Sequence, residues 1–174
     1  MTKIQASKVK YKTGFTLIEL LLYLALSAAI LLAVSVFLSI LLRSRIKNQT
    51  VAEVEQQGIA VMNHLTAAIR SAENINEPAL GLSAGSLSLD AFGSTNDPAV
   101  FAVSGSAITV TEGSGSSQNL TSSRVTVSGV SFQNLSRSGT PGIVRAQFTL
   151  TYLNPTGKNE YEYSKTFYAS ASLR

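Results

Sequence analysis

The chain has 174 residues, and only 14% of them are charged, against roughly 25% in an average soluble domain. The formal net charge of +4 resides in the first 14 residues, which hold four lysines, because the rest of the chain carries ten basic and ten acidic side chains. This distribution argues against a nucleic-acid-binding face on a folded domain, and the absence of cysteine excludes disulfides, thiolate metal sites and cysteine nucleophiles.

A basic stretch, residues 1–13, precedes a long apolar segment. From Leu20 to Leu42 no residue is charged, and as a helix this segment would extend roughly 35 Å, enough to cross a bilayer core of about 30 Å. Basic residues follow directly, at Arg43, Arg45 and Lys47. We expect a single-pass membrane helix whose short basic N-terminus stays in the cytoplasm, with the C-terminal part of the chain on the other side.

Glu19 lies at the start of this apolar segment. An ordinary secretory signal has an apolar region of only about 7–15 residues, so an uncleaved single-pass anchor is the simpler alternative here. Such an anchor does not explain Glu19, because a carboxylate near the centre of a membrane helix costs on the order of 2.5–3.5 kcal/mol, and less near its end. Glu19 is therefore either a polar residue tolerated near the interface or a functional residue that acquires a partner.

The run Gly14-Phe15-Thr16-Leu17-Ile18-Glu19-Leu20, behind a lysine-rich leader and ahead of an apolar helix, resembles the class III signal of type IV pilins and pseudopilins. The resemblance implies that prepilin peptidase cuts between Gly14 and Phe15 on the cytoplasmic side and that the new amine of Phe15 is N-methylated. Glycine suits the position before the cut because a side chain there would crowd the protease. Glu19 would pair with the N-terminal amine of a neighbouring subunit and so set axial register during assembly.

The helix is predicted to continue well beyond the apolar segment. No proline occurs between Phe15 and Glu77, and Asn74, Asn76 and Pro78 mark the predicted end. Past the membrane half, apolar or small residues recur at three- and four-residue spacing, as on an amphipathic helix. The predicted helix has about 60 residues, roughly 90 Å in length. Its stripe consists of Val51, Val54, Gly58, Val61, Met62, Leu65, Ile69 and Ala72.

Beyond the helix the sequence predicts strands. Apolar residues alternate with polar ones over 87–91, and residues 100–103 and 108–111 flank Ser104-Gly105-Ser106, which predicts a hairpin. Residues 144–152 and 161–173 alternate around the turn 154–157, which predicts a second antiparallel hairpin. The alternation of residues 125–132 changes phase across Gly129, as a bulge or strand break requires. We expect an antiparallel sheet that covers the helix stripe, and a loop at 112–117.

No constellation in the sequence predicts catalysis or metal binding. His64 is the only histidine, which excludes histidine-rich metal sites, and a surface or packing role suits it better than ligation. Glu53 and Glu55 do not face each other on a helix, and Glu160 with Glu162 predicts a solvated strand edge.

Other short patterns carry as little chemistry. The serine-rich run 113–117 has the wrong order for a nucleophile elbow. Asp90 and Asp97, the only aspartates, do not form the acidic calcium-binding loop that some major pseudopilins have. Asn119 and Asn134 match a glycosylation acceptor pattern, which is common by chance. We expect no enzymatic activity, no cofactor, no metal and no direct nucleic-acid binding.

The sequence as a whole predicts an α+β, type IV pilin-like fold in four segments. Residues 1–14 are a cytoplasmic leader, 15–42 the membrane and filament-core half of the helix, 43–76 its amphipathic half, and 77–174 a β-rich globular headgroup packed on 43–76. The resemblance implies a structural subunit of a type IV pilus or a type II secretion-like pseudopilus. Its partners would be prepilin peptidase (also the methylase), other pilin or pseudopilin subunits, an inner-membrane assembly platform and the lipid bilayer.

A finer and more diffuse resemblance, around residues 56–71 and in the terminal hairpin, is to PilW-type minor pilins and J-type minor pseudopilins. It implies a low-copy subunit. The alternative is a single-pass membrane protein with a β-rich binding domain that never polymerises. Cleavage after Gly14 would separate the two hypotheses.

Overall fold

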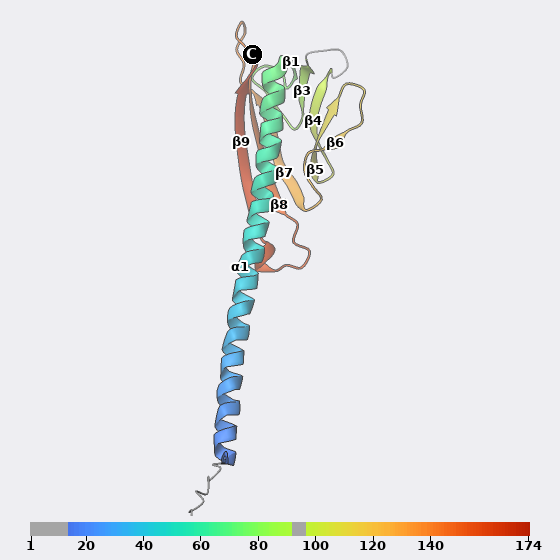
Figure 1. The fold of residues 1–174 in the computed structure, drawn as a ribbon. Coiled ribbons are helices and arrows are strands. Elements are labelled where there is room, and N and C mark those ends of the chain that lie inside the picture. The colour runs from blue at the N-terminus through green and yellow to red at the C-terminus, as the bar shows by residue number, and fades with distance from the viewer. Residues whose placement is uncertain (1–13, 92–96) are drawn as a thin grey trace, which may run out of the picture. The chain divides into compact units, whose positions relative to one another are not determined.

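The computed structural model describes residues 14–91 and 97–174 (Figure 1). It divides after Leu42 into an N-terminal unit and a second unit, Arg43–Arg174, which we call the head. The helix α1, Leu17–Ser71, runs through both. In the N-terminal unit α1 is the only regular element of the described residues, and its large apolar side chains are all exposed.

The helix ends earlier than the sequence indicated. The predicted end at Asn76 is wrong, because α1 stops at Ser71 and Ala72–Glu77 form strand β1. Strand β1 pairs antiparallel with β3, Leu87–Ala91. Asparagine competes with helical hydrogen bonding, and the side chain of Asn74 accepts a bond from the backbone N–H of Ile75 at 2.9 Å. The buried side chain of Ala72 therefore belongs to a sheet and not to the helix stripe.

The strands form two antiparallel sheets where one was expected. A five-stranded sheet has the order β1-β3-β4-β5-β6, and a four-stranded sheet has the order β2-β7-β8-β9. In the first, β4 (Ala99–Ser104) and β5 (Ala107–Glu112) form the hairpin predicted around Gly105, and β6 is the short Gln118–Asn119. The buried alternation predicted for β3 is confirmed, since Leu87 and Leu89 are fully buried.

The four-stranded sheet contains the longest strands. It consists of β2 (Ser83–Ala84), β7 (Val125–Asn134), β8 (Ile143–Tyr152) and β9 (Ser164–Ser172). The register of β7 against β8 shifts between Ser128 and Ser131, so the irregularity predicted at Gly129 is confirmed. Gly129 has a φ of 60°, a left-handed conformation that glycine adopts at little cost.

The connection between β8 and β9 is longer than the predicted four-residue turn. Tyr161 and Tyr163 were expected in the strand, but they lie in the connection, which contains a short 3-10 helix, Asn159–Tyr161. The rings of Tyr152 and Tyr161 stack at 6.1 Å, and the ammonium of Lys47 donates to the backbone carbonyls of Asn159 and Glu162. These contacts fix the connection against the helix, which local alternation could not reveal.

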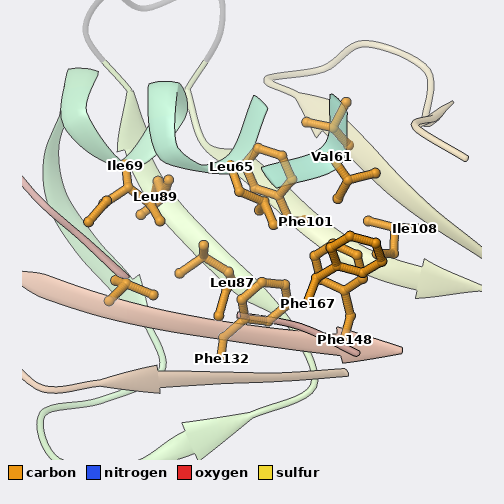
Figure 2. Close-up of a cluster of buried hydrophobic side chains, with 14 of the residues drawn as sticks. Val61, Leu65, Ile69, Leu87, Leu89, Phe101, Ile108, Phe132, Phe148 and Phe167 are labelled. Carbon is orange, nitrogen blue, oxygen red and sulfur yellow. The ribbon is translucent and has the colours of Figure 1, made fainter. Parts of the chain in front are cut away.

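The core of the head lies between the helix stripe and the sheets (Figure 2). Val54, Gly58, Val61, Leu65 and Ile69 of α1 are buried, which confirms most of the predicted stripe. Figure 2 shows Val61, Leu65 and Ile69 pointing from the helix toward side chains of both sheets. The largest fully buried strand residues are Leu87, Leu89, Phe101, Ile108, Val125, Phe132, Phe148 and Leu150.

Polar contacts tie the helix to β9 and to the segment just before β7, beside this core. The amide of Gln57 donates to the hydroxyl of Ser122 at 2.6 Å and accepts from its backbone N–H at 2.9 Å. Glu53 lies 3.7 Å from Arg124, and Glu55 lies 2.6 Å from Lys165. Glu53 and Glu55 therefore each face a cation of the head, Arg124 and Lys165 respectively.

The pair between Glu55 and Lys165 predicts a small pH dependence. The hydrogen bond from Lys165 and its charge hold the pKa of Glu55 below the ordinary 4.5, and the same hydrogen bond raises the pKa of Lys165 above 10.5. The contribution of Glu55 to stability is thus present at neutral pH and is lost as the pH falls below 4.5 through its lowered pKa. That of Lys165 is lost as the pH rises above 10.5 through its raised pKa.

Both side chains are about half exposed, so solvent screens the pair and its effect is small. We expect Glu55→Gln to lower the melting temperature of the full chain in detergent slightly at neutral pH. The difference from the wild type should vanish well below pH 4.5. The matched change at the exposed Glu73 should have no such pH-dependent effect. A difference for Glu55→Gln that persists unchanged in acid would contradict this role of the pair.

Candidate functional site

Three side chains of the N-terminal unit follow one another at intervals of four residues: Phe15, Glu19 and Tyr23. Phe15 stands two residues before α1, whereas Glu19 and Tyr23 lie within it, at a spacing that places their side chains on one face of the helix. The ring of Phe15 meets the ring of Tyr23 edge-on, with centroids 6.1 Å apart and planes at 70°. The Tyr23 hydroxyl lies 3.4 Å from Oε1 of Glu19 and is oriented to donate to it. The structure therefore brings Phe15 and Glu19 together through Tyr23.

Thr16 lies directly before Leu17, the first residue of α1. Its hydroxyl accepts from the backbone N–H of Glu19 at 3.4 Å, and its carbonyl accepts from the N–H groups of Glu19 and Leu20 at 3.1 and 3.2 Å. A threonine followed three residues later by glutamate is the sequence pattern of a capping box. The Glu19 carboxylate lies in the first turn of α1, where the helix dipole favours negative charge.

Gly14 stands just before the helix in open surroundings. A Cβ atom built on Gly14 meets no other described residue of the chain within 4 Å. Nothing in the described fold therefore requires glycine at this position. A requirement for glycine here has to come from another molecule that binds the segment.

The helix beyond the site is suited to an apolar environment. Within the described residues, α1 is the one helix long and apolar enough to cross a membrane, and none of its apolar window is buried. The hydroxyls of Ser27, Ser35 and Ser39 donate to carbonyls of their own helix, at 2.9, 2.8 and 2.8 Å. The polar groups of this segment are thus satisfied internally, as lipid requires. Its exposed apolar side chains need a lipid or protein cover.

Comparison with protein families identifies the same segment. The model of the prokaryotic N-terminal methylation motif matches residues 9–35. The chain carries a type IV pilin-like class III signal. This pilin-like signal includes Gly14, Phe15 and Glu19, and the long apolar helix followed by antiparallel sheets is an α+β pilin-like architecture. The signal and the apolar helix together indicate a membrane-anchored protein of the type IV pilin or pseudopilin type. Searches of curated proteins and of solved structures gave no match.

The other candidates from the sequence are not brought together into a site. His64 is exposed, and no group of three or more potential metal-binding side chains occurs in the ranges 14–91 and 97–174. Glu160 and Glu162 do not share a strand edge as predicted, because they belong to the 3-10 helix and its C-terminal cap. The pilin-like signal is typical of structural, non-catalytic subunits.

Two further patterns are explained by the fold. The Asn134 side chain is only 3% exposed; its amide donates to the carbonyl of Pro78 at 2.8 Å, and its oxygen accepts from the N–H of Ser136. A folded chain therefore cannot present it for glycosylation. Asp97 accepts from the N–H of Ala91 at 3.3 Å, a local contact across residues 92–96.

Thr16 and Tyr23 were not identified as site residues from the sequence. Both had a detectable signal. Thr16 stands three residues before Glu19, the capping-box spacing, and Tyr23 stands four residues after it, the spacing of helix neighbours.

Proposed function

We propose that the protein is a structural subunit of a type IV pilus or a type II secretion-like pseudopilus. The observation that carries the proposal is Glu19, a carboxylate inside a signal of the N-terminal methylation type and at the start of an exposed apolar helix. The described residues place no cation beside it, and Arg43, the first basic residue that follows, lies 24 residues further along the sequence. In a mature subunit that has lost residues 1–14 and their lysines, such a group takes its partner from another molecule.

Processing supplies that partner. Prepilin peptidase removes residues 1–14 on the cytoplasmic face and methylates the amine of Phe15, which remains a cation. The amine of one subunit then pairs with Glu19 of its neighbour, so that neither charge is left alone in an apolar setting. Each ion is costly by itself, and the pairing therefore favours one axial register between subunits.

The apolar half of the helix is surrounded by lipid before assembly and by other subunits after assembly. Before assembly its side chains lie in the cytoplasmic (inner) membrane, with the head outside the cytoplasm. On the assembly platform they move from lipid to the helices of other subunits in the pilus or pseudopilus. The exposed large side chains from Phe15 to Leu42 supply the surface for both states.

We place the protein among minor, low-copy subunits that act near the filament tip. Three features of the sequence support this assignment: it has no cysteine pair, it has no acidic calcium-binding loop, and its helix has no proline and no glycine before Gly58. The continuous helix suits a subunit at the end of a filament, which need not adapt to neighbours on every side. The diffuse likeness to PilW-type and J-type minor subunits agrees with it.

Replacing Glu19 by alanine tests the assembly role. Glu19→Ala should insert into the membrane and be cleaved normally, since loss of a lone carboxylate eases insertion by up to about 2–3 kcal/mol. Its amount in sheared filaments should fall strongly against the wild type, while Glu73→Ala, a change at an exposed carboxylate of the head, should not alter it. Quantitative mass spectrometry of membranes and filaments measures both steps. Normal incorporation of Glu19→Ala would remove the proposed role.

The same filament samples measure abundance. A minor subunit should be present in far smaller amount than another pilin of the same filament. If this chain is the most abundant protein in the purified filaments, the minor assignment is wrong, while the assembly role of Glu19 stands or falls on its own variant.

A further inference from the structure

Tyr23 differs from the other hydroxyl residues of the apolar helix. The hydroxyls of Ser27, Ser35 and Ser39 donate to backbone carbonyls of their own helix, so these donors are already satisfied. The Tyr23 hydroxyl instead approaches the charged side chain of Glu19, one turn before it. Its ring also contacts the ring of Phe15, two turns before it. One side chain thus touches both residues that the proposed assembly site uses.

The chemistry of a carboxylate explains what such a contact does. An ionised carboxylate only accepts hydrogen bonds, and it has two oxygens. In an apolar setting it is costly unless donors face it. Tyr23 offers a donor to Oε1, and among the described residues no side chain donates to Oε2. At 3.4 Å the contact is at the outer limit of a hydrogen bond, so a small rotation of either side chain shortens it.

We infer that Tyr23 is a positioning residue for assembly: its hydroxyl holds one oxygen of the Glu19 carboxylate, so that the other oxygen receives the N-terminal amine of the neighbouring subunit. This inference rests on the proposed pairing of Glu19. The edge-on contact with Phe15 orders, in addition, the residue that carries the amine after cleavage. Tyr23 also reduces the cost of the carboxylate while the subunit is still unassembled in the membrane.

Tyr23→Phe separates the hydroxyl from the ring. The variant keeps the ring contact with Phe15 and loses only the donor to Glu19. We expect normal membrane insertion, cleavage and methylation, and incorporation into filaments lowered about three- to tenfold, the range for one hydrogen bond within a membrane protein. Tyr23→Leu, which is fully apolar and inserts without difficulty, should fall at least as far. Ser27→Ala removes a hydroxyl of the same helix that does not face Glu19, and it should assemble like the wild type.

A double variant shows whether Tyr23 acts through Glu19. In a Glu19→Ala background, Tyr23→Phe should cause no further loss, because the hydroxyl has no carboxylate to hold. A merely structural tyrosine would lower incorporation by the same factor in both backgrounds. Incorporation is measured by mass spectrometry of peptides of the head in sheared filaments. This measurement is sensitive enough to detect a level lower than that of the Glu19→Ala variant.

The outcomes separate this inference from the function on which it rests. Normal incorporation of Tyr23→Phe, or an equal loss in the presence and absence of Glu19, overturns the role of Tyr23 and leaves the pairing of Glu19 intact. Normal incorporation of Glu19→Ala overturns the pairing itself. A loss for Tyr23→Phe that disappears in the Glu19→Ala background supports both.

Discussion

Replacing Gly58 by leucine should unfold the head or lower its melting temperature steeply. Gly58 is buried on α1, and a Cβ atom built there would overlap the ring of Phe167, with the ring atom Cζ nearest. That ring cannot move aside freely, because it is only 7% exposed and stacks on Phe148 with centroids 5.4 Å apart (Figure 2). Overpacking a core costs typically 1–3 kcal/mol and more for a large side chain, out of a total stability of about 5–15 kcal/mol.

Circular dichroism of the full chain in detergent during heating measures this effect. Ala60→Leu is the matched control, because Ala60 lies on the same helix but is exposed, so the added side chain meets solvent. Gly58→Ala is the milder test. On an open helix surface it would gain up to about 1 kcal/mol from helix propensity, yet here the clash with Phe167 should make it destabilising. If the head of the Gly58→Leu variant melts at the same temperature as that of the wild type, the helix does not pack on the sheet in this way.

Replacing Gly14 by leucine should leave the leader attached to essentially all of the protein. The change should be harmless to the described chain itself, since a Cβ atom built on Gly14 meets no other described residue within 4 Å. Loss of cleavage would therefore report on the fit of the segment to the peptidase. Gel mobility and intact mass of the membrane-extracted protein distinguish the two forms.

Gly85→Leu is the control for this experiment. Gly85 is also exposed, with no neighbour within 4 Å of a built Cβ, but it lies in the head, far along the sequence from the signal. That variant should be cleaved like the wild type. Normal cleavage of Gly14→Leu would mean that the peptidase does not read a small residue at this position, and the assigned cut between Gly14 and Phe15 would lose its support.

The parts of the fold that sequence could predict are those set by local patterns. A run of 23 uncharged residues and the repeating stripe from Val54 to Ile69 determine where the helix is exposed or buried. Alternation predicted β3 and β8, two runs flanking a Ser-Gly-Ser turn predicted the hairpin at Gly105, and a change of phase revealed the bulge at Gly129. In each case a few neighbouring residues decide the structure.

The incorrect predictions concern segments whose structure depends on contacts with residues distant in the sequence. Residues 72–77 form a strand because β3 pairs with them, although by spacing they continue the helix. The split into two sheets depends on which strands are neighbours, which alternation does not specify. The connection from β8 to β9 is held by the hydrogen bonds of Lys47 and by the stacking of Tyr152 on Tyr161, and these contacts join separate parts of the sequence.

The candidate site likewise contains residues that the sequence predicted and others, such as Tyr23, that it did not. Gly14, Phe15 and Glu19 were predicted because a short, specific run of residues carries them, and the methylation-motif model matches that run. Tyr23 was missed because its contacts with Glu19 and Phe15 depend on the orientation of those side chains, which only the structure shows. Its spacing from Glu19 alone did not distinguish it from a membrane-interface tyrosine.

The most direct test of the pilin-type function is the N-terminus of the mature protein in cells with an active prepilin peptidase. Mass spectrometry of the protein extracted from membranes should find a chain that begins at Phe15 and carries one additional methyl group. The same measurement in cells without the peptidase should find the chain with residues 1–14 attached. A chain that still begins at Met1 in the presence of the active peptidase would contradict the proposed processing and, with it, the pairing of Glu19 with a neighbouring N-terminal amine.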